Sequence, residues 1–396
     1  MLDIKVQSLS AVRIKSALCF RSTGKAFIRD LACGLLLLIM LGGSLKGQNQ
    51  AGAAPGILRG AESEVRSVSK VGKIHERLSD ESFPSIRRHQ GLPRLTCAYR
   101  PVSVKTTSYT AATFSVDGQH VILGSQAGIE IRTWPGMEQA GSIPTSLEHV
   151  LDMSFSPDGR TLLIAGGSPA EKGVVEVLDW GSRTILATVA DHTDVVYQVA
   201  WSQNGQAWAA ACADGRCTVI ETQTRATRFT FNGHSQSVLG LSWLAGGKQI
   251  ASVSSDQTVR LWDSTTGRLL RTLDNHVGSV TRVALRPPQE DPSSEIIATI
   301  SDDRTVRFWQ PAVGRLVRFA KLDSIPRSLL WSHDGALLYV GCDDGNVRTV
   351  RFDDAVVESA VAALSGPVLE LQFCPDTRYL LAAGHGGTRV VEMLKR

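Results

Sequence analysis

From residue 94 onward, the sequence repeats itself seven times with a period of just over forty residues. Each copy has a bulky residue followed by a short turn, as in Phe155-Ser-Pro-Asp-Gly159 and Trp331-Ser-His-Asp-Gly335. The intervals between successive bulky residues are 41, 46, 42, 42, 46 and 42 residues. A period of this length indicates an array of similar units that bury their apolar faces against one another. The bulky residues are Phe114, Phe155, Trp201, Trp243, Leu285, Trp331 and Phe373.

Each copy contains four short runs of apolar and β-branched residues, which predict antiparallel strands. In the fourth copy the runs are 238–243, 249–254, 258–263 and 268–273, with turns rich in Gly, Asp and Ser between them. Four strands in ~40–45 residues are typical of one blade of a β-propeller. One blade cannot cover both of its faces, whereas seven blades in a ring can. The predicted fold is therefore all-β, a seven-bladed propeller of four-stranded antiparallel blades over residues 94–396.

The seventh copy ends before its fourth strand. It offers runs at 368–373, 379–383 and 389–393, and the sequence stops at Arg396. One strand-like segment, 95–102, precedes the first copy and belongs to no other blade. We expect this segment to pair as the missing outer strand, which would close the ring and cover an open sheet edge.

The motifs of the fourth and fifth copies resemble those of the WD-repeat β-propeller family, whose units begin near Gly-His and end near Trp-Asp. The fourth copy has Gly233-His234 and Trp262-Asp263, with Asp256 in a turn between them. The resemblance implies a hydrogen-bonded set of His, a strand Ser or Thr, a turn Asp and Trp in such blades. In the fourth copy these are His234, Ser252 or Ser254, Asp256 and Trp262, and in the fifth they are His276, Asp303 and Trp309, with the Ser or Thr member unassigned.

Other copies depart from this pattern. The third has His192 and Asp214 but Ile220 in place of Trp, and the sixth has Asp344 and Val350 but lacks the His. We expect such blades to depend on apolar packing.

The resemblance also implies that a protein or peptide partner binds around the channel, on the face that carries the turns between second and third strands. Tyr197 and Arg327 are the strongest candidates, because Tyr is a stiff anchor and Arg can form a fork onto a partner carboxylate. The alternative is that some of the aliphatic residues at these positions merely pack between blades. The implied contact positions before the bulky residues are Thr110, Leu151, Tyr197, Leu239, Thr281, Arg327 and Leu369, and those in the turns are Gln126, Ala213, Ser255, Asp302 and Asp343.

Motifs for catalysis, metal binding or cofactor binding are not evident in the sequence. No nucleophile lies in a strand-turn-helix elbow, and no Gly-rich phosphate loop carries its Lys. The His residues recur at one repeat position, and the Cys spacing is unlike that of a zinc site. We therefore expect a non-enzymatic scaffold without metal or cofactor. The alternative is a propeller enzyme or ligand sensor acting on a carbohydrate or small molecule, which would need carboxylates that converge at the channel.

Cys212 and Cys217 flank a short turn. They could form a disulfide across a hairpin if the protein is exported. The alternative, which the small residues at the same position of other copies favour, is that Cys212 is a small buried side chain.

Residues 1–53 have the three parts of a secretory signal. Six basic side chains occur in the first 30 residues, an apolar run covers 31–45, and Ala51-Gly52-Ala53 offers a cleavage site before Ala54. The run is shorter than the ~20 apolar residues of a membrane-spanning helix. We expect cleavage and export to the periplasm, the cell envelope or the medium. Two alternatives stay open: an uncleaved membrane anchor, and an apolar helix of a cytoplasmic protein.

Charge separates the chain into two parts. Residues 1–93 carry 14 basic and 7 acidic side chains, which leaves 28 basic and 31 acidic for residues 94–396 out of 42 and 38 in total. Residues 54–93, which are polar and low in aromatics, are interpreted as a flexible linker. The repeat domain is slightly acidic and lacks the basic footprint that nucleic-acid binding requires, so no nucleic-acid partner is expected.

Overall fold

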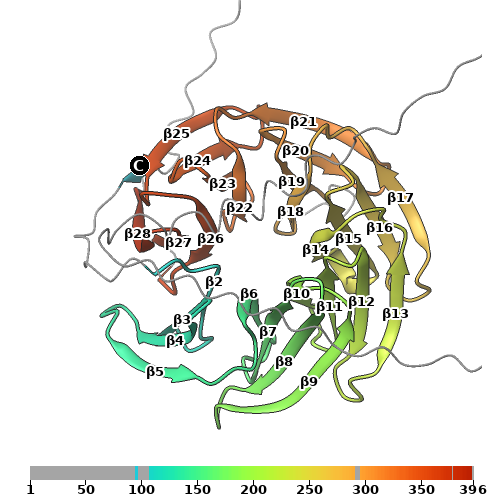
Figure 1. Cartoon of the computed structure of the whole chain (residues 1–396). Coiled ribbons are helices and arrows are strands. Elements are labelled where there is room, and N and C mark those ends of the chain that lie inside the picture. The colour runs from blue at the N-terminus through green and yellow to red at the C-terminus, as the bar shows by residue number, and fades with distance from the viewer. Residues whose placement is uncertain (1–93, 97–106, 290–294, 377, 395–396) are drawn as a thin grey trace, which may run out of the picture. The chain divides into compact units, whose positions relative to one another are not determined.

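The computed structural model describes residues 94–96, 107–289, 295–376 and 378–394. In these residues 28 strands form seven four-stranded antiparallel sheets, arranged as the blades of a ring (Figure 1). The innermost strands of successive blades contact one another all the way round, including the first and the last. The predicted seven-bladed propeller is thus confirmed.

The blades follow the chain order, each from its innermost to its outermost strand. Blade 1 contains β2 (Ala111–Phe114), β3 (His120–Ser125), β4 (Gly128–Thr133) and β5 (Gln139–Ile143). Blade 2 contains β6 (His149–Phe155), β7 (Thr161–Ser168), β8 (Lys172–Asp179) and β9 (Thr184–His192). Blade 3 contains β10 (Val196–Trp201), β11 (Ala207–Cys212), β12 (Arg216–Glu221) and β13 (Thr227–Asn232). Blade 4 contains β14 (Val238–Trp243), β15 (Gln249–Ser254), β16 (Val259–Asp263) and β17 (Leu269–Leu273). Blade 5 contains β18 (Val280–Leu285), β19 (Ile297–Ser301), β20 (Thr305–Gln310) and β21 (Arg315–Lys321); blade 6 contains β22 (Pro326–Trp331), β23 (Leu337–Cys342), β24 (Asn346–Arg351) and β25 (Val357–Ala362).

Blade 7 combines the two ends of the repeat domain. Its first three strands are β26 (Val368–Phe373), β27 (Tyr379–Gly384) and β28 (Gly387–Leu394), and its outer strand is β1 (Arg94–Thr96). In this pairing Arg94 lies opposite Leu394, and Thr96 lies opposite Glu392. The predicted closure by the segment before the first copy therefore holds at 95–96, while 97–102 lie outside the described residues.

The N-terminal predictions lie outside the described part of the chain. This applies to the signal or anchor segment at 1–53 and to the linker at 54–93. Within the described residues, the structure contains no helix of the length and apolarity needed to cross a membrane.

The hydrophobic core lies between neighbouring blades. One cluster joins Phe308 of blade 5 to Trp331, Val350 and Phe352 of blade 6. Each sheet is apolar on both faces, so every blade needs a neighbour on either side. Full burial of one such side chain contributes ~1.5–3 kcal/mol, so the packing between blades stabilises the ring.

The bulky residue of the repeat also joins blades through a hydrogen bond when it is Trp. Trp201 Nε1 donates to the Ser154 carbonyl of blade 2 over 3.0 Å. Trp243 Nε1 donates in the same way to the Ala200 carbonyl of blade 3 over 3.0 Å. The indole thus fills the space between two sheets and satisfies its only donor there.

Cys212 and Cys217 are both buried free thiols. Cys217 pairs with Ala211 across β11 and β12. Because neighbouring residues of a strand point to opposite faces, Cys212 and Cys217 face away from each other. The predicted alternative of a small buried side chain is therefore correct, and the proposed disulfide is not formed.

Candidate functional site

Bulges in the innermost strands display the residues predicted to contact a partner. Six of the seven inner strands have a one-residue register shift at their start. A bulged residue has no partner opposite it, and the strand bends there. Every one of the six side chains remains half-buried at the ring's centre. The bulged residues are Leu151, Tyr197, Leu239, Thr281, Arg327 and Leu369.

Thr110 occupies the corresponding place in blade 1. Its backbone N–H donates to the Gly124 carbonyl over 2.9 Å, immediately before β2 begins. Its hydroxyl donates to the Val150 carbonyl of blade 2. This side chain therefore joins two blades.

In blades 3 to 7 the turn between the second and third strands lies against the loop that enters the blade. The N–H of Ala213 donates to the Val195 carbonyl over 2.9 Å, and that of Ser255 to the Ser237 carbonyl over 3.0 Å. Asp302 and Asp343 make the same bond, as does His385 of blade 7, a position that was not predicted from the sequence. Turns and bulges thus share one end of the propeller, which we call the channel mouth. Its residues are the six bulged residues, Thr110, and Gln126, Ala213, Ser255, Asp302, Asp343 and His385.

Three of the predicted residues meet as an ion-pair cluster. Arg327 Nε and an Nη donate to the two Asp343 oxygens over 2.6 and 2.8 Å, and the other Nη donates to Asp302 over 3.2 Å. Burial raises the pKa of Asp302, although Arg327 opposes this. The guanidinium is therefore already held by two carboxylates of its own chain. With both Asp residues ionised, the cluster carries a net charge of −1.

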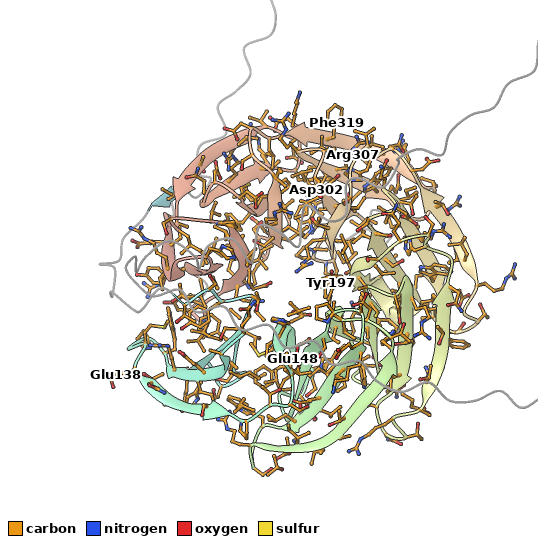
Figure 2. The ribbon with its side chains drawn as sticks, viewed as in Figure 1. Glu138, Glu148, Tyr197, Asp302, Arg307 and Phe319 are labelled. Carbon is orange, nitrogen blue, oxygen red and sulfur yellow. The ribbon has the colours of Figure 1, made fainter. Side chains whose placement is uncertain are left out.

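Tyr197 lies across the ring in blade 3, beside the central opening (Figure 2). Burial and the nearby Asp194 raise the pKa of its phenol. The bulged residues on the remaining blades are Leu or Thr. The channel mouth therefore combines an aliphatic surface with one aromatic side chain and one acidic cluster.

Polar residues that follow the bulges connect neighbouring inner strands, a role that the sequence does not predict. Asp152 accepts from the Val199 N–H over 2.8 Å, and Gln198 accepts from the Leu241 N–H over 2.9 Å. A Cβ on Gly240 would lie 2.9 Å from the Gln198 amide oxygen. Any larger residue at position 240 would therefore collide with the Gln198 side chain that makes this bond.

Two carboxyl groups on the channel wall have strongly raised pKa values. Burial raises the pKa of Glu370 to about 8, with a further contribution from Asp152. Burial also raises the pKa of Asp152 to about 6, although Arg282 opposes it. Both residues are half-buried on the innermost strands, where the charged forms of their carboxyl groups are poorly solvated.

In blade 4 the four residues implied by the WD-repeat resemblance are brought together. His234 Nδ1 lies 2.9 Å from Asp256 Oδ2, and His234 Nε2 lies 2.8 Å from Ser252 Oγ. Trp262 Nε1 donates to the same hydroxyl over 2.8 Å. The strand member is therefore Ser252, because the Ser254 hydroxyl donates elsewhere, to the Gln236 carbonyl.

Blade 5 contains the same arrangement with threonine as its strand member. His276 Nδ1 lies 2.9 Å from Asp303 Oδ2, and its Nε2 lies 2.8 Å from Thr299 Oγ1. Trp309 Nε1 donates to Thr299 over 2.9 Å. Burial lowers the pKa of His276 to about 4. Burial acts to raise the pKa of Asp303, but hydrogen bonds from Thr305 and His276 outweigh it and lower the net value.

The expectation that blades 3 and 6 depend on apolar packing is wrong, because both have polar networks. In blade 3, Thr218 of the third strand lies 2.9 Å from His192 Nε2 and replaces the missing second-strand hydroxyl. In blade 6, the buried Arg348 donates to both Asp344 oxygens over 2.9 and 2.6 Å and pairs with Asp323. The long Arg348 side chain from the third strand thus provides the hydrogen bonds to the turn Asp that the absent His would have made.

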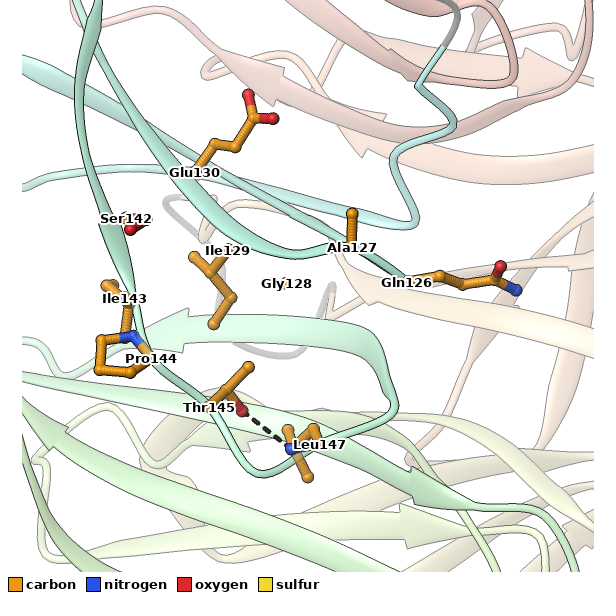
Figure 3. A pocket seen from close by; sticks show the side chains of 10 residues that line it. All are labelled: Gln126, Ala127, Gly128, Ile129, Glu130, Ser142, Ile143, Pro144, Thr145 and Leu147. Carbon is orange, nitrogen blue, oxygen red and sulfur yellow. Dashed lines mark hydrogen bonds between the residues drawn. The ribbon is translucent and has the colours of Figure 1, made fainter.

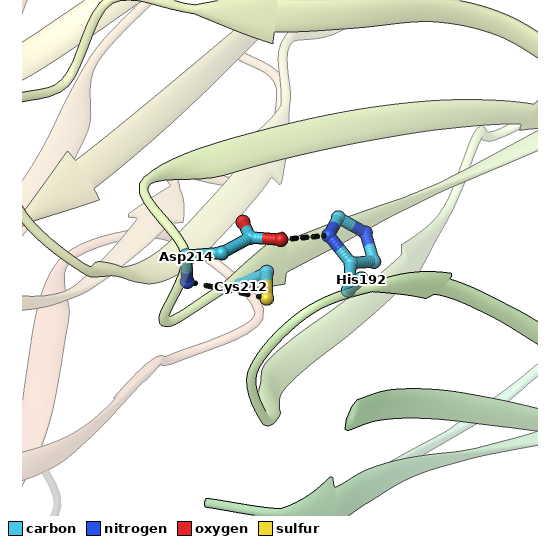
Figure 4. Close-up of side chains that lie close together, drawn as sticks. All are labelled: His192, Cys212 and Asp214. Carbon is cyan, nitrogen blue, oxygen red and sulfur yellow. Dashed lines mark hydrogen bonds and ion pairs between the residues drawn. The ribbon is translucent and has the colours of Figure 1, made fainter. Parts of the chain in front are cut away.

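His192, Cys212 and Asp214 are close enough together to resemble a metal site (Figure 4). The groups of this cluster are, however, engaged within the chain. His192 uses both ring nitrogens, on Asp214 and Thr218, and the Cys212 thiol donates to the Asp194 carbonyl over 2.9 Å. Burial raises the pKa of Cys212, which disfavours the thiolate that a metal needs. The cluster is best explained as the structural network of blade 3.

A shallow pocket of about 370 Å³ opens on blade 1 beside Gln126 (Figure 3). Its one charged lining residue is Glu130, which accepts from the Tyr109 hydroxyl over 3.1 Å and pairs with Arg132. The Thr145 hydroxyl at its edge donates to Glu176 over 2.7 Å. These polar groups hold the entering loop in place.

Comparison with known proteins identifies four of the repeats. The family described as "WD domain, G-beta repeat" matches residues 183–221, 226–263, 267–310 and 320–349. The COMPASS component SWD3 of Saccharomyces cerevisiae is 29% identical over 140 residues, which is 35% of this chain and 42% of that protein. The WD repeat-containing protein slp1 of Schizosaccharomyces pombe is 30% identical over 144 residues, 36% of this chain and 28% of that one. An uncharacterized WD repeat-containing protein of Synechocystis is 27% identical over 136 residues. In each case the match spans less than half of the relative's length.

Proposed function

Because this chain belongs to the WD-repeat family, we propose that it is a non-enzymatic scaffold that binds a protein or peptide at its channel mouth. The names of two further relatives support this class: a cofactor of the APC complex from Arabidopsis thaliana and an apoptotic protease-activating factor from Rattus norvegicus. As fold alone does not determine function, the proposal depends on the site.

The observation that carries the proposal is the set of six bulges at the channel mouth. They hold side chains of mixed character half-exposed on a rigid ring, where a partner can bury them with little loss of conformational freedom. Leu151, Leu239 and Leu369 supply the apolar part of this surface. The cluster of Arg327, Asp302 and Asp343 is complementary to a basic group of the partner.

Replacing Tyr197 by alanine is expected to weaken partner binding by more than ~1 kcal/mol while the fold is retained, since a stiff aromatic anchor is lost. Arg327→Ala should have a similar effect, because it releases the two carboxylates that it positions. The partner is first recovered by affinity capture with the tagged full chain in its native cell, and its affinity for each variant is then measured by calorimetry.

Tyr379→Ala serves as the control for Tyr197→Ala, because Tyr379 begins β27 at the other end of the propeller. The control should bind like the parent. If both channel-mouth variants also bind like the parent, the partner uses another surface and the proposal fails.

A second candidate function is an enzyme or sensor that acts on a carbohydrate or small molecule in the channel. Asp152 and Glu370 favour it, because two carboxyl groups with raised pKa values influence each other there. General acid catalysis near neutral pH uses a carboxyl of this kind. Hydrolysis of 4-nitrophenyl glycosides by the parent, and its loss in Glu370→Gln, would support this second function over the scaffold.

We further propose that residues 1–53 direct export and are removed before Ala54. The order of basic, apolar and small residues supports this proposal. The measurement is the intact mass of the protein purified from its native cell, which should correspond to a chain that begins near Ala54. A cytosolic chain that keeps its N-terminal residues would refute the export proposal, and a membrane-bound one would indicate an anchor.

A further inference from the structure

A second surface with its own chemistry lies on the outer rim of blades 4 and 5. It consists of β17, β21 and the turns before them, residues 264–273 and 311–321, and we call it the rim patch. The patch has five basic residues and no acidic one, although the repeat domain as a whole is slightly acidic. The basic residues are Arg268, Arg271, Arg315, Arg318 and Lys321.

Large apolar side chains are exposed between these charges. Leu269 and Leu270 are 43% and 45% exposed, Val313 is 58% exposed and Phe319 is 56% exposed. Among the described residues, Phe319 is the one aromatic side chain in the group of exposed large hydrophobics. It lies on the outer rim, away from Tyr197 (Figure 2). Exposed aromatic and aliphatic side chains next to Arg are typical of binding surfaces.

The two strands form one continuous surface. β17 and β21 follow each other along the rim (Figure 1). Arg271 of blade 4 donates through an Nη to the Ala312 carbonyl of blade 5 over 2.9 Å. A Cβ added to Gly314 would lie 3.3 Å from Arg271 Cδ. The side chains of blade 4 therefore pack directly on the turn that leads into β21.

Charged residues on outer strands also protect open sheet edges from aggregation. Two arginines of other blades are neutralised: Arg228 of the outer strand β13 pairs with Glu221, and Arg351 at the end of β24 pairs with Asp354 and Glu358. None of the ion pairs formed by the described residues involves the five basic residues of the rim patch. Arg271 and Arg318 instead donate to backbone carbonyls. Charged residues of either sign can protect a sheet edge, so edge protection alone does not explain why all five charged residues of the rim patch are basic.

We propose that the rim patch is a second docking surface, separate from the channel mouth, for an acidic segment of a partner protein. The carboxylates of the segment would pair with Arg268, Arg271 and Arg315, and its apolar side chains would pack on Leu270 and Phe319. The open edges of the outer strands favour an extended polypeptide, whose backbone can bond to their free peptide groups. A single aromatic side chain provides no stacking platform for nucleic-acid bases.

The test uses the full chain and a short fluorescein-labelled peptide of alternating glutamate and leucine, with binding measured by fluorescence anisotropy. The double variant Arg271→Glu/Arg315→Glu should bind the peptide about tenfold more weakly, and Phe319→Ser about fivefold more weakly. The matched control, Arg160→Glu/Lys172→Glu, makes the same charge change at exposed residues of blade 2 and should bind within about twofold of the parent.

Two further peptides define the chemistry. Alternating lysine and leucine should fail to bind, and alternating glutamate and serine should bind more weakly, because it lacks the apolar contacts. The proposal is overturned if the rim-patch variants bind the acidic peptide like the parent, or if the basic peptide binds equally well. It is also overturned if these variants instead lose binding to phosphatidylglycerol vesicles or to polyadenylate. Tyr197→Ala should leave peptide binding unchanged, so this outcome is independent of the channel mouth.

Discussion

Replacing Asp303 by alanine is expected to lower the free energy of unfolding by ~2–4 kcal/mol, because a buried network loses its acceptor. The Asp303 carboxylate accepts from His276 over 2.9 Å, from Val277 N–H over 3.2 Å, and from the Thr305 N–H and hydroxyl over 3.0 and 2.6 Å. After the substitution, the buried His276 keeps a ring nitrogen without its partner. Equilibrium unfolding of the full chain in urea measures the loss.

The neighbouring Asp302 provides a matched control in the same turn. Its side chain is 39% exposed and meets Arg327 at 3.2 Å, while Asp343 repels it. Asp302→Ala should therefore change the free energy of unfolding by less than ~0.5 kcal/mol. Asp256→Ala in blade 4 should behave like Asp303→Ala. If Asp303→Ala lowers the free energy of unfolding no more than the small change expected for Asp302→Ala, the polar network does not stabilise the blade.

The architecture could be predicted from the sequence because it depends on features that are local and repeated. The spacing of the bulky residues determines the number of blades, and the missing last strand indicates how the ring closes. The network of blade 4 could also be predicted, since His234, Asp256 and Trp262 match a known pattern residue by residue. Only the choice between Ser252 and Ser254 needed the structure, because both are small hydroxyls on one strand.

The other features of the site depend on which side chains contact each other in space. Residue types alone do not show these contacts. Arg348 replaces a histidine that would have come from a different strand, so an alignment of the repeats finds only a gap. Arg327 was expected to be available to a partner carboxylate. It is held by Asp302 and Asp343, which approach it only because the turns of blades 5 and 6 are neighbours in the ring. The sequence identified these three positions but not their mutual neutralisation.

Replacing Glu370 by glutamine is expected to make the protein more stable at alkaline pH and to leave it nearly unchanged near pH ~5. The folded pKa of Glu370 is raised by burial to about 8 from an ordinary value of 4.5. The unfolded chain therefore loses this proton more readily than the folded chain does. Stability is highest while the group is protonated in both states, and it declines as the pH rises from 4.5 to about 8. Glutamine remains neutral throughout and can still accept the Gln372 bond, which is 2.9 Å long in the parent.

The size of this effect is limited because Glu370 is half-buried and not fully buried, and because its pKa also depends on Asp152. We expect a gain of ~1–3 kcal/mol above pH ~8.5, less than the full shift in pKa implies. The measurement is urea unfolding of the parent, Glu370→Gln and the exposed control Glu138→Gln across this pH range. The control should follow the parent at every pH. If Glu370→Gln is instead less stable than the parent at alkaline pH, the charge of Arg282 fully offsets the desolvation of the Glu370 carboxylate, and the surroundings of Glu370 favour its charged form.

Burial also lowers the pKa of His276 to about 4. The folded chain then binds that proton less readily than the unfolded chain does, so His276 destabilises the fold as the pH falls from 6.5 to about 4. The contributions of His276 and Glu370 to stability therefore change in opposite directions between pH 4.5 and 6.5, and Glu370→Gln should remove the decline that Glu370 causes as the pH rises.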